Sequence, residues 1–288
     1  MNNSFRPLLN RGMALSCCAL ALAVSFSLQA QVVLLTDGNS TANINLGGGA
    51  GNLGMNSWTV NGQNQLAQQW FWFRVDNTGP QHTIDTIGNL SKVNNANSLN
   101  ATYTSFGNYG VTISYQLSGG AAGGGDYTSD ILESISIQNL SAVNTLNFHF
   151  FQYSDFNLMG TPGGETANIF NSGGFFTKAT VTKLVGQVAE TIDSPLANHG
   201  EADIGANTLN RLNTVNNLQL NDITTSGPDP TKDATWALEW DLSIAPNSSQ
   251  DVLKDKKLSV APVPEPATLA LFSLGLLGFA LRRNRRSA

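Results

Sequence analysis

The feature that most constrains the fold is an alternation of apolar and polar residues that recurs along most of the chain. The stretches "QWFWFRVDN" (69–77), "YGVTISYQL" (109–117) and "ATWALEWDLSI" (234–244) repeat with a period of two, and turns rich in glycine, asparagine and proline separate such runs. A period of two places alternate side chains on opposite faces of a strand. Many short strands without a long amphipathic helix predict an all-β chain, folded as a single β-sandwich with a jelly-roll-like arrangement.

Two segments depart from this alternation. In "ILESISIQ" (131–138) the isoleucines share one face, but Glu133 falls on that face and Leu132 falls on the polar one. In "ANTLNRLNTVNNL" (206–218) three apolar residues are spaced three apart, which fits a turn of helix. Because asparagines surround them, we expect either a short helix or an irregular loop there.

The N-terminal residues 1–30 predict a cleavable signal peptide. Arg6 and Arg11 give a basic start, an apolar run covers 13–26, and the small residue Ala30 offers a cleavage site before Gln31. The alternative is an anchor that is never cut, although a run of this length spans the hydrocarbon poorly. Both cysteines of the chain lie in this segment, so we expect a mature protein without disulfides or thiolate metal sites.

Charge is distributed unevenly between the body and the ends of the chain. Residues 31–261 contain nine Lys and Arg against nineteen Asp and Glu, whereas the other six basic residues lie in the two ends. An acidic body lacks the cationic face that a phosphate backbone requires. We therefore expect no nucleic-acid partner.

The C-terminal residues 259–288 form a separate signal behind a predicted body of 31–258. The motif Pro264-Glu265-Pro266 precedes an apolar stretch, 267–281, which would make a transmembrane helix of about 22 Å. A bilayer core is about 30 Å thick, so the stretch is short for a permanent span. The polar residues from Asp255 to the motif indicate a tether. Arginines that would stay on the cytoplasmic side end the chain: Arg282, Arg283, Arg285 and Arg286.

This order of features resembles the PEP-CTERM sorting signal of Gram-negative bacteria. The resemblance implies recognition by an exosortase, a membrane-embedded processing enzyme, followed by cleavage near Pro264-Glu265-Pro266 and release or attachment at the cell surface. It also implies an association with exopolysaccharide and biofilm matrix. An ordinary C-terminal anchor is the alternative. The stretches 137–158 and 234–249 are similar to the β-rich bodies common among such proteins, from which no catalytic role can be transferred.

Loop carboxylates are weak candidates for calcium ligands. Asp126 and Asp130 lie in "GGGDYTSD", and Asp155 lies in "YSDFN". Calcium prefers carboxylate and carbonyl oxygens on loops, but aspartate is also common in turns for conformational reasons. Apart from this calcium hypothesis, no cofactor is expected.

Other side chains bear on carbohydrate chemistry. A pair of carboxylates among Glu133, Asp155 and Glu239 could serve glycoside hydrolysis, because separation across a fold is invisible in a sequence. None of the histidines has the spacing of a zinc hydrolase, and we expect His149 to be solvent-side or strand-pairing. Aromatic residues that could stack on sugars, or equally fill the core, are Trp70, Trp72, Tyr103, Tyr109, Tyr115, Trp236 and Trp240.

The sequence thus favours a non-enzymatic exported protein of the cell surface or extracellular matrix. Its expected partners are an exosortase-type enzyme and exopolysaccharide, and its contact with the membrane through the C-terminal segment is transient. Two other hypotheses remain open. One is a carbohydrate-binding module, and the other is an exported hydrolase.

Overall fold

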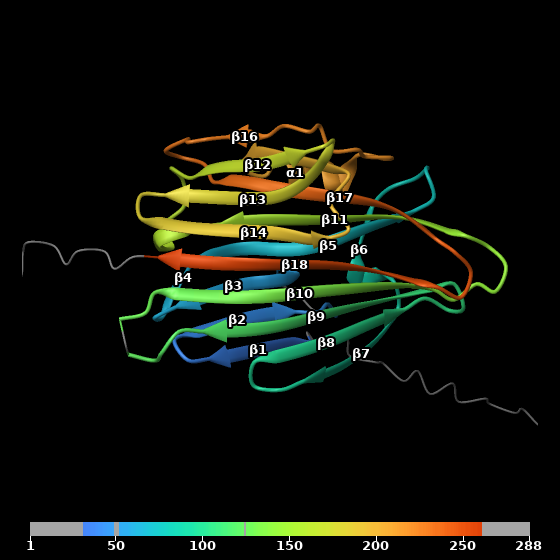
Figure 1. Cartoon of the computed structure of the whole chain (residues 1–288), viewed down its shortest axis with the longest axis horizontal. Coiled ribbons are helices and arrows are strands. Elements are labelled where there is room, and N and C mark those ends of the chain that lie inside the picture. The colour runs from blue at the N-terminus through green and yellow to red at the C-terminus, as the bar shows by residue number, and fades with distance from the viewer. Residues whose placement is uncertain (1–30, 49–51, 124, 261–288) are drawn as a thin grey trace, which may run out of the picture.

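The computed structural model describes residues 31–48, 52–123 and 125–260. These residues form two antiparallel sheets that overlie each other as a sandwich (Figure 1). Among them, none of the helices has the length and apolar character needed to cross a bilayer. The predicted signal peptide, including Ala30, and the predicted transmembrane stretch 267–281 lie outside the described residues.

The first layer, which we call sheet 1, has the strand order β1-β2-β3-β5-β11-β17-β15, with β4 paired to β3 and β6 paired to β5. Its described strands are β1 (Val32–Asp37), β2 (Ser40–Asn45), β3 (Gly54–Val60), β4 (Gln63–Asn64), β5 (Leu66–Val75), β6 (His82–Thr83), β11 (Leu146–Phe156), β15 (His199–Ile204) and β17 (Ala234–Ile244). Strands β5, β11 and β17 are neighbours within it, and β15 lies beyond β17.

The second layer, sheet 2, has the order β16-β12-β13-β14-β18-β10-β9-β8-β7. Its described strands are β7 (Asn89–Asn94), β8 (Ser98–Thr104), β9 (Tyr109–Gly119), β10 (Thr128–Asn139), β12 (Thr166–Ser172), β13 (Phe175–Lys183), β14 (Gly186–Ser194), β16 (Thr225–Ser226) and β18 (Ser249–Val260). The helical turns η1 (Ile84–Thr86) and η2 (Leu158–Gly160) and the helix α1 (Asn207–Thr214) complete the described elements. Helix α1 confirms the helical alternative for 206–218.

The strand order differs from the jelly-roll-like arrangement that the sequence suggested. Strands that follow one another in sequence are mostly neighbours in one sheet, as in β1-β2-β3, β7-β8-β9-β10 and β12-β13-β14. A jelly roll instead consists of eight strands arranged as two Greek keys. Short turns between consecutive strands favour hairpins, and hairpins keep the chain in the same sheet.

The alternation seen in the sequence fills the space between the sheets with side chains. On β5, Phe71 and Phe73 point inward, where Phe71 stacks on Phe150 with a centroid separation of 5.3 Å and Phe73 stacks on Phe148 at 5.6 Å. Each of these rings is buried. Aromatic pairs of this kind add about 0.5–1.5 kcal/mol beyond the free energy of area burial.

A group of four charged side chains also lies between the sheets, and we call it the inner cluster. It consists of Glu133 on β10, Glu190 on β14, and Lys254 and Lys256 on β18, all with no exposed surface. Lys256 lies 2.8 Å from Glu133 and 3.3 Å from Glu190, while Lys254 contacts Glu133 and lies 3.4 Å from Glu190. In the sequence, Glu133 interrupts the apolar face of 131–138. In the structure it points inward and belongs to an ion-pair network.

The predicted tether from Asp255 is wrong in its first part. Strand β18 runs from Ser249 to Val260 and pairs with both β10 and β14, so it lies in the interior of sheet 2. Lysines occupy two consecutive inward positions of this strand, Lys254 and Lys256. Because lysine is common in exposed linkers, the sequence pattern there predicted a polar linker instead of a strand. The inner cluster supplies the partners that make such burial tolerable, because a buried ammonium group requires a counter-charge.

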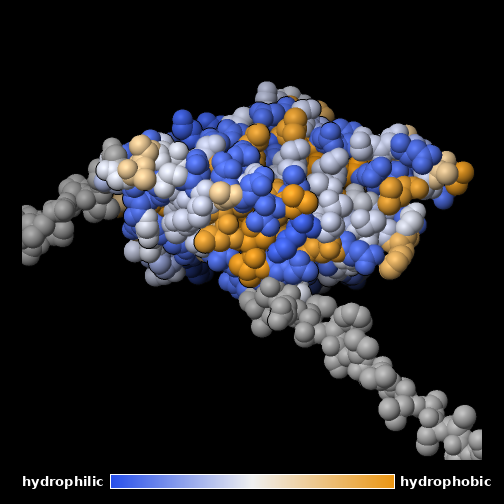
Figure 2. Space-filling view, turned by 90° about the horizontal axis from the view of Figure 1, so that it is seen from below, coloured by the Kyte–Doolittle hydropathy of each residue, from blue (hydrophilic) through white to orange (hydrophobic). Residues whose placement is uncertain are grey.

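The edge of the sandwich formed by β1 and β7 lies at the bottom of Figure 1 and faces the viewer in Figure 2. Apolar side chains gather near the middle of this face among polar ones (Figure 2). Val32 and Leu34 of β1 are about half exposed. The amide of Thr36 donates to the carbonyl of Ala96, 2.7 Å away, so part of this edge is paired with the turn that joins β7 and β8.

Candidate functional site

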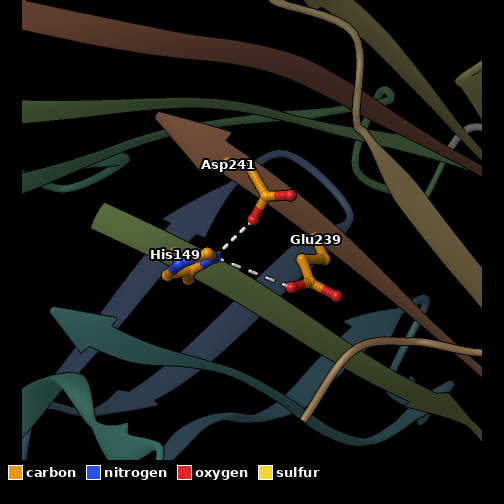
Figure 3. Close-up of side chains that lie close together, drawn as sticks. All are labelled: His149, Glu239 and Asp241. Carbon is orange, nitrogen blue, oxygen red and sulfur yellow. Dashed lines mark hydrogen bonds and ion pairs between the residues drawn. The ribbon is translucent and has the colours of Figure 1, made fainter. Parts of the chain in front are cut away.

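A polar row crosses the centre of sheet 1 on its outer face, which is the face turned away from sheet 2. The backbone register pairs His149 on β11 with Asp241 on β17 and with Arg74 on β5. Glu239, two residues before Asp241, pairs with His199 on β15. Figure 3 shows His149, Glu239 and Asp241 converging on one point. We call His149, His199, Glu239 and Asp241 the outer cluster.

The alternation on β17 places the two acidic side chains of this cluster outward. Trp236, Leu238 and Trp240 are buried, and the indole N–H of Trp236 donates to Glu190 of sheet 2 across the core. Because successive side chains of a strand point to opposite faces, Glu239 and Asp241 must lie on the outer face. The same rule places His149 outward, between the inward rings of Phe148 and Phe150.

Residues 205–224, which we call the covering segment, cross this outer face and include α1. The segment is held by Glu201 of β15, a buried carboxylate that accepts from Thr208, from the amide of Asn221 at 2.8 Å and from Arg211 at 2.7 Å. Its asparagine-rich end at Asn213 accepts from the indole of Trp72 at 3.0 Å. The covering segment therefore shields part of the outer face and leaves the outer cluster at its margin.

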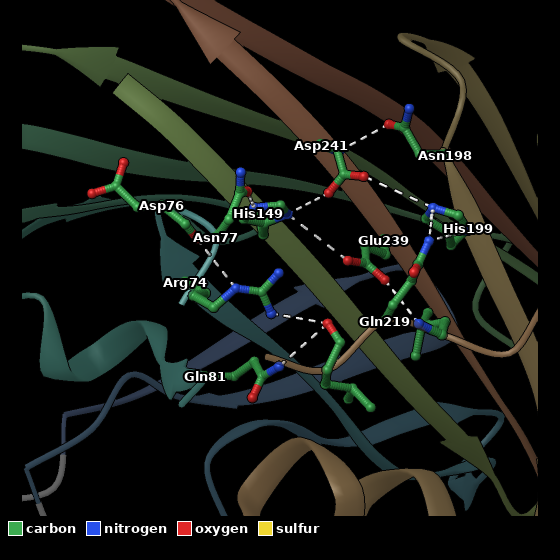
Figure 4. A network of polar contacts seen from close by, with 12 residues as sticks. Arg74, Asp76, Asn77, Gln81, His149, Asn198, His199, Gln219, Glu239 and Asp241 are labelled. Carbon is green, nitrogen blue, oxygen red and sulfur yellow. Dashed lines mark hydrogen bonds and ion pairs between the residues drawn. The ribbon is translucent and has the colours of Figure 1, made fainter. Parts of the chain in front are cut away.

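Each outer-cluster side chain is oriented by a neighbour (Figure 4). His149 contacts Asp241 through Nδ1 and lies 2.9 Å from Oδ1 of Asn77 through Nε2. Glu239 accepts from the amide of Leu220, 2.9 Å away, and its other oxygen lies 3.9 Å from Nδ1 of His149. The covering segment thus fixes one oxygen of Glu239 and leaves the other facing the imidazole.

Two carboxyls that stand side by side have opposite electrostatic environments. Burial raises the pKa of Glu239 to about 7, against a smaller opposing effect of the hydrogen bond from Leu220. The hydrogen bond from His149 instead lowers the pKa of Asp241. Asp241 is 37% exposed and Glu239 only 1%, which accounts for the direction of the difference. Pairs of titratable groups whose environments separate their pKa values are typical of functional sites.

A pocket of about 220 Å³ opens over this group. Its walls are formed by Arg74, Asn77, His149, Asn217, Leu218, Gln219, Glu239 and Asp241. A second hollow of about 400 Å³ shares Arg74 and includes the rings of Phe73, His82 and Tyr109. The guanidinium of Arg74 donates to the carbonyl of Leu218 at 2.9 Å, which ties the floor of the first pocket to the covering segment.

The predicted calcium ligands do not meet at one site. Asp126 accepts from the backbone amide of Thr128 at 3.0 Å, in the loop before β10. Asp130 lies within β10 on sheet 2, whereas Asp155 lies on β11 of sheet 1. Burial raises the pKa of Asp155 to about 7, with the nearby charge of Asp233 contributing in the same direction.

The aromatic candidates for sugar stacking are mostly core residues. Six of the seven are at most 2% exposed, and only Tyr109 keeps partial exposure. They fill the space between the sheets or, as Trp72 does, the space beneath α1. The structure therefore offers no exposed aromatic platform among these seven side chains, although Tyr109 lines the second hollow.

Sequence reasoning identified part of the outer cluster. It named Glu239 as a possible catalytic carboxylate and placed His149 at a solvent-side or strand-pairing position, as the structure shows. It missed Asp241, His199 and the covering role of 205–224. The available signal was the pattern Glu-x-Asp on the face of β17 opposite its tryptophans, since two acidic outward positions in the middle of a central strand are unusual for a covered face.

The residues predicted for processing lie outside the part of the chain that the structure describes. For the signal peptide they are Ala30 and the preceding residues, whereas Gln31 is described and precedes β1. The sorting residues Pro264, Glu265 and Pro266 and the terminal arginines also lie outside it. Their assignment rests on sequence.

Two solved structures align with this chain. A bacterial glucoamylase complexed with acarbose matches with a TM-score of 0.55 at 11% identity, over 86% of this chain and 35% of the glucoamylase chain. A heparan sulfate lyase HepC mutant from Pedobacter heparinus matches with a TM-score of 0.40 at 6% identity, over 78% of this chain and 34% of the lyase chain. This chain spans about a third of the length of either protein. The glucoamylase match shows a shared fold and nothing more.

No curated protein matches the sequence. The C-terminal segment does match a family model, described as the PEP-CTERM protein-sorting motif, over residues 262–286. This match covers the motif Pro264-Glu265-Pro266, the apolar stretch and the arginines that the sequence analysis singled out. The chain therefore carries a PEP-CTERM sorting signal, which is the mark of an exported protein processed by an exosortase.

Proposed function

We propose that this protein binds extracellular polysaccharide at the cell surface or in the matrix, without catalysing a reaction on it. The sorting signal marks the chain as an exported protein. The body then presents a sandwich with a polar pocket at the margin of the covering segment. Exopolysaccharide is the partner that this location and this chemistry favour.

The observation that carries the proposal is the composition of the pocket over the outer cluster. Arg74, Asn77 and Gln219 supply donors, and Glu239 and Asp241 supply acceptors, around a volume of about 220 Å³. Sugar hydroxyls both donate and accept, so they require such a mixed set. Pockets with a few convergent polar groups are the usual form of small-ligand sites.

The neighbouring hollow extends this surface with rings. Tyr109 and His82 line it, and Arg74 borders both hollows. A sugar presents C–H groups on one face and hydroxyls at its rim, so a site with one apolar and one polar part suits it. Part of a glucoamylase solved with acarbose shares this fold, so we propose acarbose as a first soluble ligand to test alongside exopolysaccharide.

The experiment compares two exposed glutamines in affinity electrophoresis through gels that contain polysaccharide. Gln219→Ala removes a pocket side chain, and Gln116→Ala removes an exposed side chain on β9 of sheet 2. We expect retardation of the wild type to be weakened by Gln219→Ala and unchanged by Gln116→Ala. Absence of retardation for the wild type in exopolysaccharide and in α-glucan gels would contradict the proposal.

A second candidate function is exported acid–base catalysis on a glycan. The specific observation in its favour is the separation of the Glu239 and Asp241 pKa values, because a proton donor and an ionised carboxylate side by side are what such chemistry requires. Chromatography of oligosaccharides incubated with the protein distinguishes the two functions. Shorter products that disappear with Glu239→Gln would favour the enzyme.

The sorting step has its own test. Two prolines keep the motif extended, and Glu265 resists entry into hydrocarbon, so the motif would stay at the membrane surface within reach of the processing enzyme. In a host with an exosortase, we expect Glu265→Ala to block maturation while the apolar stretch still enters the membrane. Mass spectrometry of wild-type and variant protein measures this. If both retain the tail through Ala288, the segment serves only as an anchor.

A further inference from the structure

We propose that the outer cluster binds a divalent transition-metal ion of the zinc class, with His149, Glu239 and Asp241 as ligands and His199, beside Asp241, as the fourth after its ring shifts. The inference is independent of polysaccharide binding, because it follows from how the two imidazoles are oriented. It also differs from the calcium hypothesis, which concerned other residues. The following observations lead to it.

The ring of His149 presents its second nitrogen to two carboxylates. Its Nε2 lies 2.9 Å from Oδ1 of Asn77, an amide oxygen that can only accept, so Nε2 carries a hydrogen. Nδ1 faces an oxygen of Asp241 and, 3.9 Å away, an oxygen of Glu239. Without an ion, a proton on Nδ1 forms the hydrogen bond to Asp241. A metal ion would displace that proton and bind Nδ1 and the two carboxylates, because metal ligands must be deprotonated.

The ring of His199 is arranged in the same way from the other side. Its Nδ1 lies 3.1 Å from both oxygens of Asp222, which makes this nitrogen the donor. Its Nε2 therefore holds the lone pair and lies 3.8 Å from an oxygen of Asp241. The amide of Gln219, 2.7 Å from Nε2, donates to it and would turn away when an ion binds.

Both rings thus have the anchoring that metal-binding histidines show. A ligating histidine almost always donates its other ring N–H to a carboxylate, a carbonyl oxygen or water, which fixes its tautomer. Asn77 performs this role for His149, and Asp222 performs it for His199. The two anchors come from different segments, the turn after β5 and the covering segment.

The carboxylates are free to serve as ligands. Arg74, the nearest cation on this face, donates to the carbonyls of Asp76 and Leu218 and does not pair with Glu239 or Asp241. One oxygen of Glu239 is held by the amide of Leu220, so the other can bind an ion. Two carboxylates also balance the charge of a divalent cation between neutral imidazoles.

The dimensions and ligand types favour a zinc-class ion. One ligand atom from each of His149, Glu239 and Asp241 lies within 4.8 Å of the others. Zinc binds nitrogen at about 2.0–2.1 Å, so its ligands stand roughly 3.4 Å apart in a tetrahedron, and binding would draw these atoms together and require a larger movement of His199. Imidazole favours zinc, cobalt, nickel and copper, whereas calcium takes oxygen ligands alone.

The experiment uses the full-length protein with a histidine-free affinity tag, stripped with EDTA. Zinc is titrated by calorimetry, and cobalt is added as a spectroscopic probe of nitrogen and oxygen ligation. We expect one ion per chain and cobalt absorption bands that zinc abolishes. Asn77→Ala, which removes the anchor of His149, should weaken affinity by about 10–100-fold, and His149→Gln should weaken it more.

The third histidine provides the matched control. His82 lies on β6 outside the outer cluster, so His82→Gln should bind zinc as the wild type does. Circular dichroism checks that each variant is folded. Absence of zinc binding by folded wild-type protein, or equal affinity of wild type and His149→Gln, would overturn the proposal. So would nitrogen NMR showing that His149 stays doubly protonated in the presence of zinc, because a proton would then be the positive group.

Discussion

The inner and outer clusters are built from the same kinds of element yet have opposite characters. Each brings two carboxylates and two basic side chains together from three adjacent strands of a sheet. In the inner cluster the bases are lysines and no side chain reaches solvent. In the outer cluster the bases are histidines, and Asp241 is 37% exposed. One lies between two sheets, and the other lies beside a pocket.

The difference lies in whether the charges are already paired. Each lysine of the inner cluster lies within ion-pairing distance of both Glu133 and Glu190, and Gln152 and Trp236 donate to Glu190 from the opposite sheet. Positive and negative charges are equal, so the cluster needs no further ion. In the outer cluster, imidazole nitrogens that can lose or gain a proton face two carboxylates at the wall of a pocket. A closed, balanced set indicates a structural role, and an open set indicates a ligand.

Removing one charge from the inner cluster tests its structural role, and we expect this change to have the largest effect on stability. Glu133→Ala leaves Lys254 and Lys256 with one carboxylate in a site without water access. We expect the free energy of unfolding to fall by about 3–5 kcal/mol, as for other buried pairs that lose one partner. Urea denaturation measures the change. Gln138→Ala, an exposed position on the same strand, should stay within about 0.5 kcal/mol, and equal effects of the two variants would contradict the structural role.

The next effect concerns the pH dependence that the outer cluster confers. The pKa of Glu239 rises from an ordinary value of 4.5 to about 7 on folding, so the folded protein holds this proton more tightly than the unfolded chain. The contribution to stability is complete below about pH 4.5 and is lost as the pH rises through about 7. Between these limits we expect the wild type to lose about 2 kcal/mol relative to Glu239→Gln, allowing for solvent in the pocket.

Urea unfolding of both proteins at pH 5 and pH 8, in EDTA so that no ion competes with the proton, measures this difference. Asp155 also has a raised pKa and gives the wild type and Glu239→Gln the same additional slope. Asp155→Asn should therefore remove a separate share of the pH dependence. Parallel pH profiles for the wild type and Glu239→Gln would show that Glu239 titrates alike in the folded and unfolded chain.

The smallest expected effect on stability concerns the covering segment, which crosses the outer face of sheet 1 beside the outer cluster. Arg211→Ala removes the contacts of 2.7 and 2.9 Å to Glu201 but leaves the donors Thr208 and Asn221 in place. We expect a loss of about 1 kcal/mol in overall stability, because the guanidinium is partly exposed. Hydrogen exchange of the Leu220 and Asn221 amides should accelerate more than that of β11. Uniform acceleration would mean that the segment is not a separate unit.

The fold was largely predictable, because alternation is a local property. The residues of 69–77 alternate between the inner and outer faces of β5. The prediction that Ile131, Ile135 and Ile137 share one face is confirmed, and that face is buried. The order of the strands was not predictable from the same pattern, since alternation states which face is buried and not which strand is the neighbour. The jelly-roll-like expectation was wrong for that reason.

The two errors of pattern reading have one physical cause. The alternation placed Glu133 on an apolar face, where a charge was not expected. The lysines of β18, Lys254 and Lys256, led to the prediction of a tether where the structure has a strand. Each is a charge that only its partners make compatible with burial, and those partners lie more than fifty residues away in sequence. A local pattern does not contain this information, although three charges at apolar positions did mark where the network would form.

What the sequence determined by itself was the destination and the class of fold. The sorting signal is a short linear motif, read from contiguous residues, and the period of two is set by the geometry of a strand. What the tertiary structure decided was which charges meet. His149 and Asp241 are 92 residues apart, and register pairing across β11 and β17 brings them into contact. A functional cluster in a β-sandwich depends on strand neighbours and register, which arise only when the sheets assemble.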